Sequence, residues 1–281
     1  MSSDSLAAVT PLLITFNEEV NLSRTLAGLH WAQRIVVVDS GSTDATLQLL
    51  ARVPQVEIVQ RPFDTFAGQC NHGLSLIRSP WCLSLDADHR LTPSFVREMS
   101  QVLAAIGPEV DALLTPFRYL VAGQPLRGTL LPARFNLVRI GGGRYVDDGH
   151  AHRFVPIGAT AALRQPILHD DRKPLSRWLA AQQRYLDQEC DKLLSAPVSA
   201  LGFADRLRLL HVVAPFAALI VCLVLRRGLL DGWRGWFYAF QRLYVEVLLS
   251  LLLWDRRNML ALHCADPVGG DSSRLEKFPQ R

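Results

Sequence analysis

The sequence has little of what marks several common protein classes. Lysine is almost absent from its 281 residues, the basic residues are mostly arginines spread along the chain, and the net charge is only +4. Without a block of basic residues there is no arm for nucleic acid, so no nucleic-acid partner is expected. The first residues do not form a basic region followed by an apolar core and a cleavage site, so no secretory signal is expected.

Two further absences narrow the possibilities. The cysteines show no Cys-x-x-Cys spacing, which disfavours zinc sites and disulfide frameworks and favours reduced thiols in a cytosolic compartment. They are Cys70, Cys82, Cys190, Cys222 and Cys264. No Gly-x-Gly-x-x-Gly motif follows the first or second expected strand, so a dinucleotide-binding dehydrogenase is also disfavoured.

The most informative stretch is Trp81–Asp88, where an apolar run stops at two carboxylates. Trp81–Leu85 is apolar on both faces and follows Ser79-Pro80, which is typical of a short buried strand. Asp86 and Asp88 then lie at its C-terminal end, where open α/β sheets place their ligand crevice. Mg²⁺ and Mn²⁺ bind few protein oxygens and complete their coordination with substrate phosphates, so this pair indicates a metal–phosphate site.

Strands and helices alternate on both sides of this stretch. We expect strands over Val9–Phe16, Ile35–Val38, Val56–Gln60, Ala112–Leu120 and a segment ending at Ile167–His169. We expect helices from Asn21, over Ala45–Ala51, Gly68–Leu76, Pro93–Ile106 and Leu175–Leu194. We expect Gly123–Gly149 to form loops around short strands. This alternation with short links predicts an α/β fold with a doubly wound, mostly parallel sheet.

The composition changes in the last third of the chain. Leu209–Leu225 carries no formal charge and, as a helix, would be about 25 Å long, with a kink at Pro215. A second apolar helix is expected over Leu243–Trp254, after an aromatic group that begins at Trp233. These segments predict a C-terminal apolar helical hairpin that associates with a membrane, by spanning it or lying on it; a hairpin buried against the domain is the alternative. The expected units are residues 1–200, the hairpin 201–264 and a polar tail 265–281.

Three motifs in this order resemble glycosyltransferase family 2, and in particular its branch with lipopolysaccharide-core glucosyltransferases. The motifs are Thr15–Glu19 and Val37–Asp44, which end the first two strands, and Leu85–Asp88, which ends a later one. The resemblance is strong over Val9–Phe95 and weaker to His169. It implies a GT-A nucleotide-sugar fold, transfer with inversion and a divalent metal.

The resemblance also implies roles for individual residues. Glu18 and Asp39 would contact the nucleoside, Asp86 would lie near the ribose and pyrophosphate, and Asp88 would ligate Mg²⁺ or Mn²⁺. The chemistry is suitable, because carboxylates accept hydrogen bonds from hydroxyl and N–H groups and a metal offsets charge on a departing diphosphate. Two structural alternatives stay open: Asp39 could cap a helix, and Glu18 could be a surface residue in a first helical turn.

Inversion needs a general base near the acceptor hydroxyl. We favour Asp148, followed by Asp147, Asp170 and His150. The chain departs from the family in two places. It has His150-Ala151-His152 where relatives often carry His-Glu, and Cys70 where they tend to have a cation. Because position 70 lacks a cation, we expect the donor phosphates to be contacted by Arg61 or Arg134, or by His169 with Arg172-Lys173.

These features predict an inverting, metal-dependent glycosyltransferase. It would transfer a sugar from a nucleotide-sugar donor, expected to be UDP-linked, to a lipid-linked or cell-envelope glycan acceptor. The expected location is the cytoplasmic face of a bacterial inner membrane. Two alternatives are a non-catalytic nucleotide-sugar-binding scaffold of the same fold and a haloacid-dehalogenase-type phosphatase. The latter is disfavoured because its Asp-x-Asp usually lies on the first strand.

Overall fold

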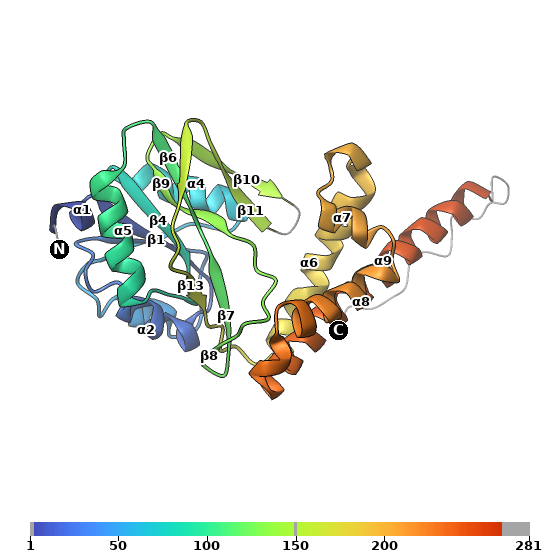
Figure 1. Ribbon diagram of the computed structural model, residues 1–281. Coiled ribbons are helices and arrows are strands. Elements are labelled where there is room, and N and C mark those ends of the chain that lie inside the picture. Colours follow the sequence, from blue (N-terminus) through green and yellow to red (C-terminus); the bar gives the residue numbers. More distant parts are fainter. Residues whose placement is uncertain (1–2, 149–150, 266–281) are drawn as a thin grey trace.

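A computed structural model of the chain describes residues 3–148 and 151–265 (Figure 1). Its centre is a seven-stranded sheet in the order β12-β6-β9-β4-β1-β2-β3. The strands are β1 (Val9–Thr15), β2 (Ile35–Asp39), β3 (Val56–Gln60), β4 (Trp81–Asp86), β6 (Val110–Thr115), β9 (Arg134–Arg139) and β12 (Ala159–Ala162). Only β9 runs antiparallel to its neighbours. The mostly parallel α/β sheet expected from the sequence is therefore confirmed.

Both faces of this sheet are covered. The helices on one face are α1 (Ser3–Ala7), α2 (Glu19–Ala27), α3 (Thr46–Leu50) and α5 (Pro93–Ala105). The other face is covered by α4 (Phe66–Leu76) and by a hairpin of β10 (Gly143–Asp148) and β11 (Ala151–Pro156). Side chains alternate between faces along a strand, so Val37 packs in the first layer and Val36 and Val38 in the second. This explains why β2 is apolar throughout.

The single strand expected over Ala112–Leu120 is wrong. Pro116 separates β6 from β7 (Phe117–Val121), and β7 belongs to a different sheet. A proline has no N–H to continue a ladder of hydrogen bonds, so the chain leaves the main sheet there. This second sheet has the order β5-β13-β7-β8, with β5 (His89–Arg90), β8 (Gln124–Pro125) and β13 (Ile167–His169). It brings β13 beside the end of β4.

Local capping rules account for several helix starts. Thr92 accepts a hydrogen bond from the Phe95 N–H, with Pro93 in the first turn, as the sequence predicts. The helix expected from Asn21 begins earlier, at Glu19. Asn21 is buried inside it, where its amide donates to the carboxylates of Glu18 and Asp171. Because the Asn21 side chain is bonded to these two carboxylates from within the helix, it does not cap the helix.

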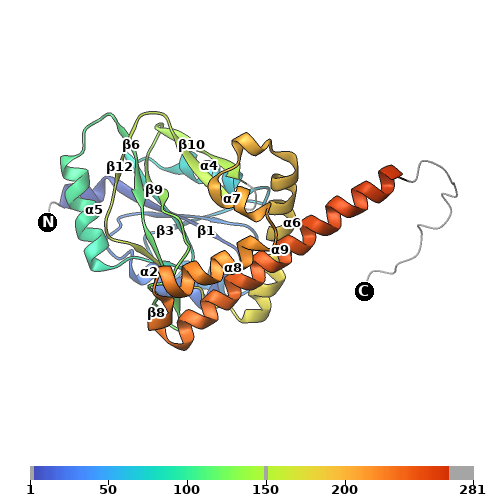
Figure 2. The same cartoon turned by 45° about the vertical axis from the view of Figure 1, so that its right-hand side comes forward.

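The C-terminal third forms a separate layer of helices beside the sheet (Figure 2). Its main elements are α6 (Leu175–Ser195), α7 (Phe203–Arg208), α8 (Val213–Ile220) and α9 (Trp233–Ala265). Short turns lie at Val198–Ala200 (η1), Val221–Leu225 (η2, a π-helical turn) and Gly228–Asp231 (η3). The helices α8 and α9 pack against each other, which confirms a C-terminal apolar hairpin.

The bounds of that hairpin differ from expectation. The continuous helix predicted over Leu209–Leu225 begins only at Val213, because His211 adopts a left-handed conformation. Pro215 consequently lies in the first turn, where no helical N–H partner is required, and not at a kink. The helix expected over Leu243–Trp254 is the middle of the much longer α9.

Helix α6 also packs on α9, through a cluster that includes Leu186, Cys190 and Leu249. The division of the chain near residue 200 stays a prediction. Within α9, the segment Trp233–Asn258 is long and apolar enough to cross a membrane, judged by length and composition only.

Candidate functional site

The carboxyl ends of three parallel strands meet at one edge of the main sheet. In the parallel register Thr15 of β1 pairs with Asp39 of β2, and Ile14 pairs with Asp86 of β4. The acidic motifs that end these strands therefore lie at the same edge, as the sequence predicts. Open α/β sheets bind ligands at such edges.

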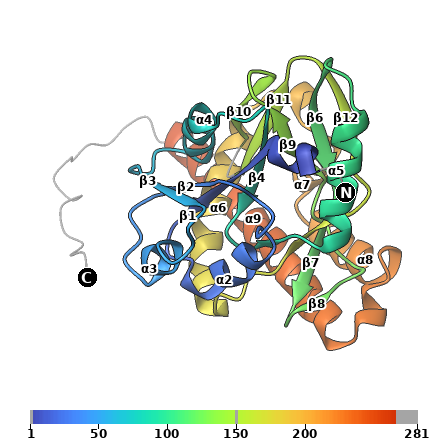
Figure 3. The same ribbon diagram turned by 90° about the vertical axis from the view of Figure 1, so that its left-hand side faces the viewer.

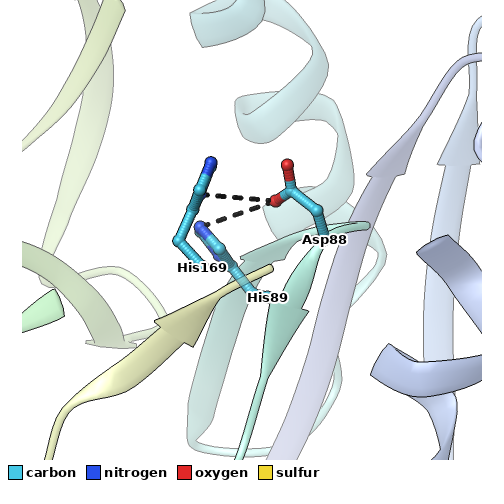
Figure 4. Close-up of side chains that lie close together, drawn as sticks. All are labelled: Asp88, His89 and His169. Atoms are coloured by element: carbon cyan, nitrogen blue, oxygen red, sulfur yellow. Dashed lines mark ion pairs between the residues drawn. The ribbon is translucent and has the colours of Figure 1, made fainter. Parts of the chain in front are cut away.

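Three side chains just beyond β4 could hold a metal ion: Asp88, His89 and His169 (Figure 4). One ligand atom from each lies within 4.8 Å of the others. Asp88 Oδ1 is 3.6 Å from His169 Nδ1 and 3.9 Å from His89 Nε2. This buried oxygen has no hydrogen-bond partner among the described residues. A buried carboxylate oxygen without a partner is unfavourable, so the arrangement suits a cation.

A backbone hydrogen bond determines which ring nitrogen of His89 carries the proton. Its Nδ1 accepts a hydrogen bond from the Asp86 N–H at 2.9 Å. Burial lowers the pKa of His89 to about 3, so the ring is neutral near pH 7. A neutral ring that accepts at Nδ1 carries its proton on Nε2, which faces the carboxylates of Asp86 and Asp88. His89 therefore turns an N–H group toward the two aspartates at 3.5 and 3.9 Å, and Asp88 and His169 are the better metal ligands.

The two aspartates differ in ionisation. Burial raises the pKa of Asp88 to about 6, helped by the negative charge of Asp86. Removal from water also disfavours the ionised form of Asp86, but the facing His89, His152 and Arg134 side chains outweigh it and lower the pKa to about 2. Two carboxylates that share one site often split in this way, and a cation would bring both into the ionised state.

Asp39 is held by its own loop. The side chain is fully buried, and Oδ1 accepts hydrogen bonds from the N–H groups of Gly41 and Ser42. Oδ2 accepts from the hydroxyls of Thr15 and Ser42. These four bonds fill the acceptor capacity of a carboxylate. Asp39 thus shapes the turn after β2 in this conformation, and its contact with a nucleoside stays a prediction.

Glu18 joins the first strand to the segment that follows β13. Its carboxylate pairs with Lys173 and also accepts from Asn21. The Glu18 and Lys173 side chains are 13% and 17% exposed, so this is a largely buried ion pair. Glu18 is therefore not a simple surface residue, although its role toward the nucleoside is untested.

Asp170 has a structural role. It is buried, and its carboxylate pairs with Arg90 at 2.9 Å, Arg172 at 2.8 Å and Arg24 at 3.3 Å. The bonds from Arg172 and Arg90 overcome the effect of burial and lower its pKa. A carboxylate so strongly held is a poor base, which removes Asp170 from the candidates.

The favoured base, Asp148, ends β10 on the side that faces α6. Its carboxylate is 41% exposed and lies 3.0 Å from Lys192 and 3.6 Å from Arg153. Asp147 accepts a hydrogen bond from the Ala67 N–H. In the backbone register of the β10–β11 hairpin it lies opposite His152. His150 lies outside the described residues.

Of the arginines proposed for the phosphates, Arg134 is near enough to Asp86 to lower its pKa, as is His169. Arg61 is paired with Asp64 at 2.6 Å, and Arg172 and Lys173 are bonded to Asp170 and Glu18. Cys70, which stands where relatives tend to have a cation, is buried in the core. Arg134 is thus the arginine best placed for a ligand at Asp86.

Sequence reasoning missed an aromatic contact between the site and the C-terminal helices. Tyr119 of β7 stacks on His169 at 4.9 Å and packs against Tyr238 of α9 at 5.0 Å. Tyr238 also accepts a hydrogen bond from the Leu130 N–H. Tyr119 lies in a segment without a recognised motif, and only the fold brings it between His169 and Tyr238.

The chain belongs to glycosyltransferase family 2. The sequence profile described as Glycosyl transferase family 2 matches residues 12–170, which include the three acidic motifs and His169. The resemblance expected from the sequence is therefore confirmed, and the fold is of the GT-A type.

Among curated proteins, the chain is 27% identical to the lipopolysaccharide core biosynthesis glycosyltransferase LpsC of Rhizobium meliloti (strain 1021). This match covers 66% of the chain and 71% of the relative. It is 28% identical to an uncharacterized glycosyltransferase of Rickettsia bellii (strain RML369-C), over 34% of the chain and 33% of that protein.

Solved structures include similar folds at low sequence identity. The mannosyltransferase PcManGT from Pyrobaculum calidifontis, in complex with GDP-Man and Mn²⁺, is 16% identical with a TM-score of 0.48, covering 88% of this chain and 87% of its own. S. aureus TarS, in complex with UDP-GlcNAc, is 14% identical with a TM-score of 0.46, covering 85% and 81%.

Proposed function

We propose that this protein is an inverting, metal-dependent glycosyltransferase. It transfers a sugar from a nucleotide-sugar donor, UDP-linked by preference, to a lipid-linked or cell-envelope glycan. The observation that supports this most strongly is the buried Asp88 oxygen, which faces His169 at the ligand edge of a family 2 sheet and has no hydrogen-bond partner within residues 3–148 and 151–265. A scaffold that only bound nucleotide sugars would need no general base.

The residues fit a divalent cation. Asp88 and His169 would ligate Mg²⁺ or Mn²⁺, which when bound offsets the charge on the departing diphosphate. His89 would keep Asp86 and Asp88 oriented through its Nε2–H, and Arg134 would add a second positive charge for the phosphates. Glu18 and Asp39, at the neighbouring strand ends, would bind the nucleoside.

The acceptor hydroxyl must lose a proton as its oxygen attacks the anomeric carbon, and we propose that Asp148 takes it. Its carboxylate is partly exposed at the end of β10, which is compatible with access to an acceptor. The pair with Lys192 would have to open when the acceptor binds, because the carboxylate oxygen that takes the proton must be free to contact the acceptor hydroxyl.

The acceptor class is inferred from two observations. One is the identity to LpsC, whose name assigns it to lipopolysaccharide core biosynthesis. The other is the large apolar surface of the C-terminal helices, with exposed side chains such as Phe216, Trp233 and Phe240. A protein that binds the bilayer surface gains effective concentration toward a lipid-linked acceptor. We place it at the cytoplasmic face of a bacterial inner membrane, where nucleotide sugars are available.

A transfer assay tests this function. The protein is incubated with labelled UDP- and GDP-hexoses and membranes that contain truncated envelope glycans, with Mn²⁺ or with EDTA. We expect labelled glycolipid only with Mn²⁺, and an anomeric configuration in the product opposite to that of the donor. Asp148→Asn should abolish transfer but keep donor binding. Asp147→Asn, which removes one carboxylate charge from the neighbouring residue of β10, is the matched control. Full transfer in EDTA, or retention of configuration, would contradict the proposal.

A further inference from the structure

A pocket lies where the β7–β8 hairpin meets the start of α9, and its lining includes none of Asp88, His89 and His169. It has a volume of about 450 Å³, within the usual range for ligand sites. Figure 3 shows β7 and β8 beside the C-terminal helices, as does Figure 1. Three of the lining residues are arginines: Arg118, Arg127 and Arg234.

The charge of this pocket is only partly balanced. Asp231 lies 3.6 Å from Arg127 and accepts hydrogen bonds from the N–H groups of Arg127 and Gly128. Among the described residues no carboxylate pairs with Arg118 or Arg234. The Nε of Arg234 is buried and lacks a hydrogen-bond partner there, while its guanidinium lies 5.1 Å from the ring centroid of Trp233. Two arginines without acid partners beside one cavity favour an anionic ligand.

The pocket opens beside the apolar surface of the helices. Leu230, which lines it, is 66% exposed, and Trp233 next to Arg234 is 59% exposed. The exposed apolar side chains continue along α8 and α9, as at Phe216 and Phe240. Arginine beside tryptophan at the border of an apolar surface is the combination that binds at the headgroup level of a bilayer.

We infer that this pocket binds the phosphate headgroup of an anionic membrane lipid while the adjoining apolar surface enters the bilayer. Arg118 and Arg234 contact the phosphate, and Leu230 and Trp233 lie against the acyl region. The inference rests on the membrane association proposed above. It adds a defined lipid site, which would fix how the protein sits on the membrane, and it is independent of sugar transfer.

Vesicle flotation tests the site, with vesicles of phosphatidylcholine alone or mixed with phosphatidylglycerol. The full chain is compared with Arg118→Gln/Arg234→Gln, and with Arg226→Gln/Arg227→Gln as a matched control. The control removes the same charge from exposed residues of the same region that do not line the pocket. Each arginine near an anionic bilayer strengthens binding about fivefold, so the pocket variant should bind the mixed vesicles at least about 25-fold more weakly than the unaltered chain.

The pocket variant should lose clearly more binding than the control, and both should bind phosphatidylcholine vesicles and UDP as the unaltered chain does. Equal losses of binding in the two variants would indicate only nonspecific electrostatic attraction and would contradict a specific lipid site in the pocket. Calorimetric binding of inorganic phosphate at this pocket, with no preference for anionic vesicles, would overturn the assignment to a lipid. No binding to either vesicle type would overturn the membrane association itself, whereas intact UDP binding would leave the donor site standing.

Discussion

At the scale of single residues, the group of Asp88, His89 and His169, which could hold a metal ion, carries features that lower stability. Asp88 is 12% exposed, carries a raised pKa and lies close to a second carboxylate. Natural sites often retain such unfavourable groups because function needs them. The buried ion pair of Glu18 with Lys173 holds the same edge of the sheet together.

Asp88→Asn should therefore stabilise the metal-free protein while it abolishes metal-dependent donor binding. A folded-state pKa of about 6 lies above the ordinary 3.8, so the folded state binds the proton more tightly and stability falls as pH rises from about 4 to about 6. At pH 7.5 removal of this charge should raise the free energy of unfolding by about 1–3 kcal/mol. Thermal unfolding in EDTA at several pH values measures this. A variant less stable than the parent at pH 7.5 would contradict it.

Lys173→Met should destabilise the protein by about 2–4 kcal/mol, because it leaves the Glu18 carboxylate without its cation in a largely buried place. Adding Glu18→Gln should recover part of that loss. Urea unfolding of the two single variants and the double variant measures the coupling. Glu57→Gln is the control: its pair with Arg34 is exposed, and the loss should stay below about 1 kcal/mol. Strict additivity of the first two changes would show that the pair is not coupled.

Much of the acidic edge could be predicted from the sequence. Asp86 and Asp88 follow an apolar strand, and parallel strands bring Asp39 to the same edge. The sequence also named His169 and Lys173 as candidates for the phosphates, but not their contacts with Asp88 and Glu18, because both residues reach these carboxylates only through the second sheet. Local sequence does not encode contacts over so many residues.

At the scale of elements, an ion network joins the C-terminal helices. Arg208 of α7 lies 2.9 Å from Glu246 of α9 and 3.0 Å from Glu189 of α6. Both carboxylates are nearly inaccessible to water. One guanidinium therefore connects three helices.

Arg208→Met should loosen these helices, at a cost of about 3–5 kcal/mol, because Glu246 keeps its buried charge but loses its nearest cation. Hydrogen exchange should increase in α6, α7 and α9 and stay unchanged in β1 and β4. Arg256→Met provides the control, since that arginine bridges to Asp187 and Asp191 on the exposed side of α6. Similar exchange in the two variants would argue against a special role for Arg208.

Element boundaries show where sequence patterns fail. The apolar run Ala112–Leu120 suggests one strand, yet the missing N–H of Pro116 divides it between two sheets. Pro215 suggests a kink, but the helix begins at Val213. Pro215 therefore lies in the first turn, where its missing N–H breaks no helical hydrogen bond. Proline positions were visible in the sequence, whereas the pairing of neighbouring strands and the conformation of His211 were not.

At the scale of the whole molecule, an α/β sheet with an acidic edge lies beside a helical layer with an exposed apolar surface (Figure 2). The alternation of strands and helices predicts the sheet, and the change of composition in the last third of the chain predicts the apolar helices. Their connection through Tyr119, between His169 and Tyr238, could not be predicted because it depends on the second sheet.

The apolar surface should be the main source of membrane binding. Phe240 and Leu251 of α9 are 53% and 52% exposed, so Phe240→Ser/Leu251→Ser removes a membrane contact at little cost to the core. Burial of a large apolar side chain contributes about 1.5–3 kcal/mol when complete, so binding to phosphatidylcholine vesicles should weaken about 10- to 100-fold. The control Phe63→Ser/Ile157→Ser changes exposed residues outside the helical layer. An equal loss in the control would refute the assignment.

The most direct test of the central claim is calorimetric binding of UDP-sugars to the full chain with and without Mn²⁺, repeated with Asp88→Asn. We expect binding that requires Mn²⁺ and is lost in the variant, although the variant remains folded and at least as stable. Equal binding by the variant, or binding that EDTA leaves unchanged, would contradict a donor site built around a metal on Asp88 and His169.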